Sequence, residues 1–292
     1  MRKLIIITMI SLGLFACSTN HDKADAYGNF EAKEVVISAM AQGEILRLEI
    51  NEGDLLHKGD EIGLIDTVDL VLRKKQLARA KDAVRTGLIT IDAQIEVQLQ
   101  QKENLLKDKD RLEKLYADGA ATRKQLDDMN GAIDLLEAQM KAAKSQKQKI
   151  IAEIGTLDAQ TDQLIEALSK CHIRPSVSGT VLTKYAEPGE VAAIGKPLFK
   201  LADMSKMKLK VYVSGDQLPH IKIGQKVEVQ IDESKTKNRS LEGTISWVSS
   251  TAEFTPKTIQ TKEERVNLVY AVKIFVKNDG TIKIGMPGEV NF

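Results

Sequence analysis

The 292-residue sequence has few aromatic side chains, only two cysteines and almost no net charge. Aromatic residues make up 4% of the chain, so several modest modules are expected rather than one large globule. Cys17 and Cys171 are too few for a disulfide framework. The 42 basic and 41 acidic residues leave a net charge of +1, which removes the electrostatic argument for binding nucleic acid.

The sequence also lacks a pattern that indicates catalysis or metal binding. The four histidines are scattered and show no ligand spacing: His21, His57, His172 and His220. The Cys171-His172 pair follows a long helical segment, where a buried free thiol is expected and a nucleophile or metal ligand is the alternative. We therefore expect no enzymatic activity, no catalytic residues, no metal and no cofactor.

The N-terminus has the pattern of an export signal. Arg2 and Lys3 precede an apolar run over residues 4–14. This run is shorter than the roughly 20 residues that a helix needs to span a bilayer. It predicts a signal peptide over residues 1–16.

The end of this signal indicates a lipid anchor. The sequence Leu14-Phe15-Ala16-Cys17 resembles a bacterial lipobox, although Phe15 is bulkier than the small residue usual there. The resemblance implies that the sulfur of Cys17 is acylated and that cleavage makes Cys17 the mature N-terminus, followed by a polar tether over residues 17–30. The alternative is an ordinary secretory signal in which Cys17 is incidental.

Two segments far apart in the chain repeat one another. Residues 39–66 and 175–202 align without a gap at a constant offset of 136. The coincident glycines are Gly43 with Gly179, Gly53 with Gly189, and Gly59 with Gly195. The coincident apolar residues are Ile45 with Val181, Leu55 with Val191, Ile62 with Leu198, and Ile65 with Leu201. We expect these apolar residues to face a core and the glycines to form turns. Because neither half can bury enough apolar surface alone, the halves (residues 31–68 and 171–203) are predicted to pair into one small β-sandwich.

A long helical hairpin is predicted between the two halves, over residues 69–170. Residues 69–116 and 122–169 contain no proline, and apolar residues recur in each at steps of three and four. At about 1.5 Å per residue, each arm extends roughly 70 Å. The apolar positions include Leu77, Val84, Leu88, Ile91, Ile95, Leu105, Leu112 and Tyr116 in the first arm, and Ile133, Leu136, Met140, Ala143, Ile150, Ile154, Leu157 and Leu164 in the second. The turn is expected at residues 117–121, and a single straight coiled coil that dimerises is the alternative.

Polar residues interrupt the seam of the first arm. They are Lys81, Gln98, Lys102 and Lys109. We expect weaker packing in the distal half of this arm.

The C-terminal region reads as a small antiparallel β-barrel over residues 204–292. Clusters of β-forming residues are separated by turn residues and end with a strand at residues 289–292. The other predicted strands are residues 209–213, 226–231, 243–248 and 269–276. A closed barrel would protect such short strands from edge pairing. Residues 254–264 lack apolar periodicity and are expected to form an exposed loop.

The order of these modules resembles the HlyD-like membrane fusion proteins, or periplasmic adaptor subunits. The resemblance covers the chain from about residue 29 to its end. It implies an α+β multi-module fold, in which a split lipoyl/biotinyl-like β-sandwich is interrupted by an antiparallel coiled-coil hairpin and followed by the barrel. The further membrane-proximal domain of many adaptors is expected to be absent or minimal.

The hairpin tip carries the most specific functional signal. Gly119 fits the left-handed residue that ends a helix, and residues 122–125 form a capping box. Arg111, Leu115 and Thr122 resemble the arginine, leucine and serine/threonine tip motif of adaptors that dock onto TolC-like outer-membrane channels. The resemblance implies that these three residues contact the channel. The alternative is that Thr122 only caps the helix and Leu115 only fills the seam.

The resemblance also implies partners and a location. The expected role is to couple an inner-membrane transporter to the outer-membrane channel, with the chain in the periplasm of a Gram-negative bacterium, anchored by lipid to the inner membrane. An ABC-type transporter is favoured by the loop at residues 254–264, and the assembly is expected to be a trimer or hexamer. The alternatives are a biotin or lipoyl carrier, weakly suggested by Lys206 and Lys208, and a lipoprotein that only tethers envelope layers.

Overall fold

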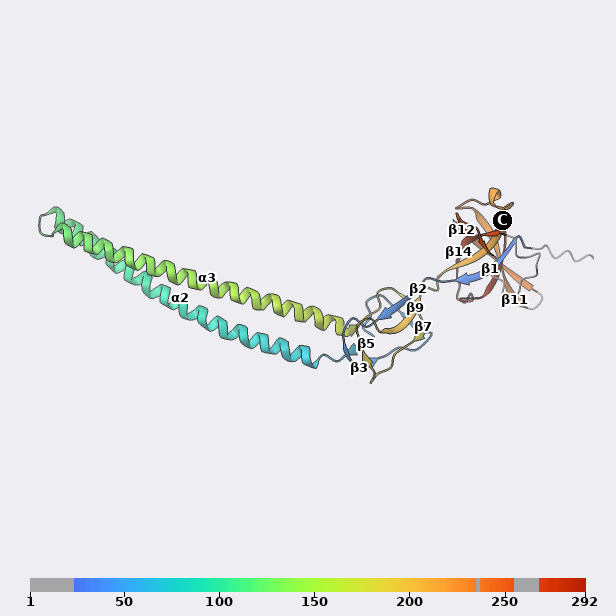
Figure 1. Ribbon diagram of the computed structural model, residues 1–292, viewed down its shortest axis with the longest axis horizontal. Coiled ribbons are helices and arrows are strands. Elements are labelled where there is room, and N and C mark those ends of the chain that lie inside the picture. The colour runs from blue at the N-terminus through green and yellow to red at the C-terminus, as the bar shows by residue number, and fades with distance from the viewer. Residues whose placement is uncertain (1–23, 235–236, 255–267) are drawn as a thin grey trace, which may run out of the picture. The chain divides into compact units, whose positions relative to one another are not determined.

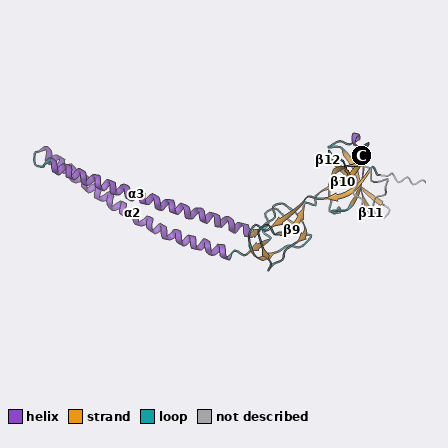
Figure 2. Cartoon of the chain, in the orientation of Figure 1, coloured by secondary structure: helices purple, strands orange, loops and turns teal. Residues whose placement is uncertain are grey.

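The computed structural model describes residues 24–234, 237–254 and 268–292 (Figures 1 and 2). The expected signal peptide, Cys17 and most of the loop at residues 254–264 lie outside this part. The described chain divides into two compact units. One unit contains the barrel, and the other contains the helical hairpin and most of the sandwich. Among the described helices, none is both long and apolar enough to cross a membrane.

The helical hairpin consists of α2 (Val68–Ala117) and α3 (Arg123–Cys171), which lie side by side (Figure 1). Three ion pairs connect the arms. They are Lys81 with Asp158, Asp92 with Lys147 at 2.6 Å, and Lys102 with Glu137 at 2.6 Å. All three pairs share one register, so the arms run antiparallel without a slip. The predicted hairpin and its boundaries agree with these helices to within one residue at each outer end.

The seam of the hairpin packs best in its distal half. Ile133, Leu136, Met140 and Ala143 of α3 are each 5–7% exposed, and Gln98 of α2 is 9% exposed. The expectation of weaker distal packing is therefore wrong. Lysines at seam positions can reach the flank of the coil with their ammonium groups and leave their methylene stems against the seam, as Lys102 does when it pairs with Glu137.

The sandwich consists of two four-stranded sheets, and each sheet takes two strands from each half of the repeat. The first sheet has the order β2 (Glu34–Ser38), β9 (Pro197–Ala202), β7 (Gly179–Lys184) and β4 (Leu55–Leu56). The second has the order β6 (His172–Ile173), β5 (Gly63–Ile65), β3 (Gly43–Leu48) and β8 (Val191–Ala192). The two halves thus interleave, as the repeat predicted.

Backbone hydrogen bonds repeat at the same offset as the sequence. The matched pairs are Glu49 N to Ile62 O and Tyr185 N to Leu198 O, both 2.8 Å, and Gly59 N to Pro175 O at 3.0 Å and Gly195 N to Ala39 O at 2.9 Å. The bonds of the second match cross between the halves, and each half donates one. The repeat in the sequence is therefore a repeat in three dimensions.

Three of the four matched apolar pairs lie in the core, and one does not. The side chains of Ile45, Val181, Ile62, Leu198, Ile65 and Leu201 are at most 6% exposed. Leu55 and Val191 are 67% and 68% exposed, so the expectation that they face the core is wrong. In each of these two-residue strands the second residue, Leu56 or Ala192, points inward instead, because successive strand residues face opposite sides.

Only two of the three glycine pairs form the predicted turns. Gly53 and Gly189 have φ of 97° and 87°, and Gly59 and Gly195 both have φ of 89°. Gly179 is needed for a close approach, because a Cβ there would lie 2.6 Å from the carbonyl oxygen of Ala202.

Six strands close the barrel. Their order around the ring is β10 (Lys206–Ser214), β1 (Ala26–Glu31), β15 (Pro287–Asn291), β11 (Lys226–Ser234), β12 (Lys237–Val248) and β14 (Leu268–Lys277), which pairs back to β10. A short strand, β13 (Glu253–Phe254), pairs antiparallel with one end of β14, and a 3-10 turn (Leu218–His220) follows β10. The predicted C-terminal strands are all present.

One strand of the barrel comes from the segment assigned to the tether. Residues 26–30 belong to β1, which pairs with β10 and β15, and Phe30 is fully buried in the barrel core. The tether therefore ends before Ala26. Gly28 allows this pairing, since a Cβ there would collide with the carbonyl oxygen of Lys210.

Truncation of one core residue tests the interleaved sandwich. In a Cys17→Ser chain, Cys171 is the remaining thiol and is 1% exposed. Ile65→Ala should cost about 2–5 kcal/mol and raise the labelling of this thiol about thirtyfold or more. Leu55→Ala is the matched control and should leave the labelling rate nearly unchanged. Equal rates for both variants would contradict the assignment of Ile65 to the core.

Candidate functional site

The tip of the hairpin begins with a specific helix end. The amide of Gly119 donates to the carbonyl of Tyr116 at 3.1 Å, and the amide of Ala120 donates to that of Leu115 at 2.8 Å. Gly119 has φ of 76°, in the left-handed region that the sequence predicted for it. These two bonds form a Schellman motif, which satisfies carbonyls at the end of α2 and fixes the turn.

Thr122 begins the second arm with a capping box. Its hydroxyl oxygen accepts from the amide of Gln125 at 3.3 Å, and the Gln125 side chain accepts from the Thr122 amide at 2.7 Å. The Thr122 hydroxyl also lies 2.9 Å from Oε1 of Gln125, to which it donates. The capping role considered in the sequence is therefore observed, and a contact of Thr122 with a partner stays a proposal.

Arg111 and Leu115 lie on the last two turns of α2 and reach solvent. The Arg111 side chain is 75% exposed and places Nη1 3.2 Å from a carboxylate oxygen of Asp108. Such an exposed pair contributes roughly 0–1 kcal/mol, so it holds the guanidinium only weakly. Leu115 is 48% exposed, so the seam covers only about half of its side chain.

Tyr116 adds a second exposed apolar side chain at the tip. The sequence placed it in the seam, but it is 43% exposed. The seam ends near Tyr116 because α3 begins at Arg123, which is the residue that faces Tyr116 in the register of the arms. The exposure of Tyr116 therefore depends on where the two helices end, rather than on the spacing of apolar residues. The tip thus combines Arg111 with the apolar pair Leu115 and Tyr116.

A charged cluster joins the two halves of the sandwich where α3 ends. Glu61 of the first half lies 2.9 Å from Nη2 of Arg174 and 3.0 Å from Nδ1 of His172, both of the second half. Arg47 lies 3.2 Å from the same carboxylate. His172 and then Arg174 lower the pKa of Glu61 below its ordinary value. Sequence reasoning missed this cluster because its members are far apart in the chain.

Cys171 lies beside this cluster as a buried free thiol. It is 1% exposed, and its sulfur lies 3.5 Å from the carbonyl oxygen of Ala167. Burial, followed by the nearby Asp66, raises the pKa of the thiol. A raised pKa disfavours the reactive thiolate, as expected for a structural cysteine. Within the described residues, no group of three or more histidine, cysteine or acidic side chains is placed to hold a metal ion.

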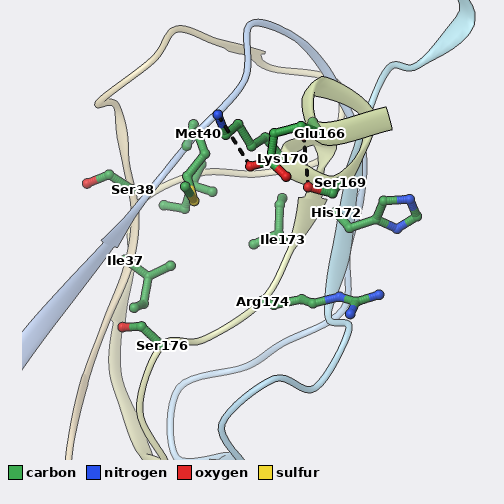
Figure 3. A pocket seen from close by; sticks show the side chains of 12 residues that line it. Ile37, Ser38, Met40, Glu166, Ser169, Lys170, His172, Ile173, Arg174 and Ser176 are labelled. Atoms are coloured by element: carbon green, nitrogen blue, oxygen red, sulfur yellow. Dashed lines mark hydrogen bonds and ion pairs between the residues drawn. The ribbon is translucent and has the colours of Figure 1, made fainter. Parts of the chain in front are cut away.

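A pocket of about 330 Å³ lies at the end of α3 (Figure 3). Ile37, Met40 and Ile173 contribute apolar surface, and Lys170 lies 3.5 Å from Glu166 along the helix. In Figure 3 the side chains of His172 and Arg174 point away from the centre of the pocket. The residues that line it include no pairing of a nucleophile with a base, so the pocket gives no evidence for a catalytic site.

The lysines considered for a carrier function are not at a turn of the sandwich. Lys206 and Lys208 both lie within β10 of the barrel, where they face Lys277 and Phe275 of β14. A carrier lysine needs an exposed hairpin turn, so these positions do not support that function.

Comparisons with known proteins agree with this architecture. The C-terminal domain of LcnD-like proteins matches residues 203–291. A UPF0194 membrane protein of Yersinia pseudotuberculosis is 27% identical, with 100% of this chain and 98% of that protein covered. Among solved structures, MacA from Actinobacillus actinomycetemcomitans has a TM-score of 0.53 at 21% identity, covering 91% of this chain and 76% of MacA. The membrane fusion protein Spr0693 from Streptococcus pneumoniae R6 has a TM-score of 0.50 at 16% identity, covering 91% of this chain and 96% of Spr0693.

The Glu61 cluster should make the sandwich sensitive to acid. Because the folded-state pKa of Glu61 lies below its ordinary value of 4.5, the cluster stabilises the fold above that pH and loses its effect as pH falls through the lowered pKa. Glu61→Gln should remove this part of the pH dependence and lower the urea midpoint at neutral pH. The midpoint can be followed by the reaction of Cys171 with dithiodipyridine, which proceeds in acid.

Glu49→Gln is the matched control for this experiment. Glu49 pairs with Arg47 at 3.3 Å, but its side chain is 66% exposed. It should leave the acid dependence intact. An unchanged profile in Glu61→Gln would exclude a stabilising role for the cluster.

Proposed function

Because this chain belongs to the HlyD-like adaptor family of membrane fusion proteins, we propose that it couples an inner-membrane transporter to a TolC-like outer-membrane channel. The function is mechanical, since the chain supplies reach and contact surfaces rather than a reaction. The observation that carries the proposal is the hairpin with its exposed tip. Helices of 50 and 49 residues extend roughly 75 Å at about 1.5 Å per residue, far more than a small sandwich needs for stability.

The tip is the proposed docking site for the channel. Arg111 can donate several hydrogen bonds to carboxylates or to carbonyls at helix ends, and its weak pairing with Asp108 leaves it free to exchange partners. Leu115 supplies an apolar anchor, and we add Tyr116 beside it. Thr122 contributes through the shape of the turn, because its hydroxyl is engaged with Gln125.

The remaining modules form the body of the adaptor. We identify the interleaved sandwich with a lipoyl-like domain that has a structural role, because the hairpin is inserted between its halves. The acylated Cys17 would anchor the chain to the inner membrane, with a tether shortened to residues 17–25 by β1. An ABC-type transporter is the favoured partner. Several copies are required, since one hairpin cannot enclose a passage, and the family resemblance implies a ring of three or six.

Site-specific cross-linking tests the docking tip. A photo-reactive residue at position 115 should trap an outer-membrane channel in cells. The same residue at position 135 is the matched control, because Leu135 is 62% exposed but lies away from the tip on α3. Cross-links to cell wall alone would favour the tethering lipoprotein, and equal yields at both positions would contradict a docking tip.

Metabolic labelling tests the anchor. Radioactive palmitate should be incorporated into the wild-type chain and not into Cys17→Ser, which should become extractable from membranes without detergent. Cys171→Ser is the control and should still be labelled. Labelling that survives Cys17→Ser would overturn the assignment.

A further inference from the structure

Aromatic side chains gather on one outer wall of the barrel. The chain has one tryptophan, five tyrosines and six phenylalanines. Six of these twelve lie on β1, β10, β14 and β12, which are consecutive neighbours in the ring, and four of the six lie outside the barrel core. They are Tyr27, Tyr212, Phe275 and Trp247. For a chain with so few aromatics, this concentration outside the core indicates a use for the surface.

The strand register places lysines among these rings. Tyr27 lies opposite Tyr212, Lys208 lies opposite Phe275, and Lys273 lies between Lys210 and Trp247 on the flanking strands. We call the residues Tyr27, Lys208, Lys210, Tyr212, Trp247, Lys273 and Phe275 the aromatic-lysine wall. Its members alternate along the strands with residues that are buried in the barrel core, such as Leu209, Val211 and Ile274. The wall therefore faces outward.

The side chains of the wall contact one another. Nζ of Lys210 lies 5.1 Å from the ring centroid of Tyr212, and Nζ of Lys273 lies 5.2 Å from that of Trp247. The strand irregularity between Ile245 and Trp247 adds one residue to β12 and turns the indole outward. Tyr27 and Trp247 remain 54% and 40% exposed. Two of the four rings, those of Tyr212 and Trp247, thus have a lysine ammonium group over them.

The wall is basic although the whole chain is nearly neutral. β10 and β14 together contain five lysines and no acidic residue. The acidic neighbours are Glu253, 3.4 Å from Lys210, Glu31, which lies opposite Lys208 on β1, and Glu289, which lies opposite Tyr27 on β15. The five lysines of the two strands outnumber these three carboxylates, so a net positive charge remains on the surface that carries the aromatic rings.

We propose that the aromatic-lysine wall binds the surface of an anionic phospholipid bilayer. Indole and phenol rings favour the boundary between acyl chains and water, where the ring is apolar and its polar atom stays wet. Lysines beside them attract anionic headgroups. A surface that mixes basic and aromatic residues therefore suits lipid better than a dry protein interface. The three lysines and the rings of Tyr212, Phe275 and Trp247 lie on three neighbouring strands, β10, β14 and β12, so they can meet a planar surface together.

The position of β1 in the sequence supports this partner, and this step rests on the proposed lipid anchor. Ala26 begins β1 nine residues after Cys17, a distance of at most roughly 30 Å for an extended chain. An acylated Cys17 would therefore hold the wall at high effective concentration near the bilayer. The lipid and the wall would act as two signals, and a second signal is what makes reversible membrane attachment stable.

Trp247 allows a direct test, because it is the single tryptophan of the chain. Residues 18–292, which lack the acylated cysteine, are mixed with vesicles of phosphatidylcholine alone or with added phosphatidylglycerol. We expect co-sedimentation, a blue shift of the Trp247 emission and quenching by brominated acyl chains, all only with the anionic vesicles. Each lysine near an anionic surface contributes about fivefold to partitioning, so Lys208→Ser, Lys210→Ser and Lys273→Ser together should lower it about a hundredfold.

The matched control removes three lysines of the same barrel that are not members of the aromatic-lysine wall. Lys222→Ser, Lys226→Ser and Lys237→Ser change the net charge equally but should lower partitioning much less. Tyr27→Ser in the otherwise native chain should reduce quenching and leave the barrel folded, as judged by an unchanged Trp247 emission in the absence of vesicles. An equal loss of vesicle partitioning in both triple variants would overturn the proposal. A Trp247 emission that does not shift when anionic vesicles are added would overturn it as well. Cross-linking of the wall to a membrane protein but not to lipid would also overturn the proposal. None of these three results would affect the adaptor role or the acylation at Cys17.

Discussion

The fold of this chain depends on strand pairing between two segments that are separated by about a hundred residues. Gly59 donates its amide to Pro175, and Gly195 donates its own to Ala39, so each half supplies a bond that the other needs. Each sheet is built from both halves, and Ile65 and Leu201 are both fully buried. Pairing of distant segments costs loop-closure entropy, which the shared core must offset. The Glu61 cluster adds a polar connection between the same halves.

This pairing also explains how a small sandwich can carry a long hairpin. β5 and β6 are antiparallel neighbours, with Leu64 opposite His172, and they lead directly into α2 and out of α3. The two arms thus leave and re-enter the sandwich at adjacent strands. An inserted hairpin then extends the reach of the chain without interrupting the core. At its far end, the Schellman motif at Gly119 and the capping box at Thr122 fix the turn that presents Arg111 and Leu115.

Much of this architecture could be predicted from the sequence, because it depends on two kinds of pattern. One is the spacing of apolar residues within a helix, and the other is the repeat of residues at a constant offset. The coincidence of Gly59 with Gly195 predicted equivalent turns, and the steps of three and four predicted both helices. β1 was missed because it is only six residues long and contains Gly28. The reason for this glycine, the close approach of β10, is evident only once the two strands pair. The exposure of Leu55 and Tyr116 was missed because it depends on the side of the strand and on the end of the facing helix. The Glu61 cluster and the aromatic-lysine wall join residues whose proximity depends on tertiary pairing.

The most direct measurement on the central pairing is the structure in solution of a chain in which residues 67–170 are replaced by a short glycine-rich turn. Because β5 and β6 are adjacent and antiparallel, such a turn can connect them. We expect the sandwich to fold without the hairpin, with the amides of Gly59 and Gly195 protected from hydrogen exchange. Unprotected amides at both glycines, in a chain whose barrel is still folded, would contradict this expectation.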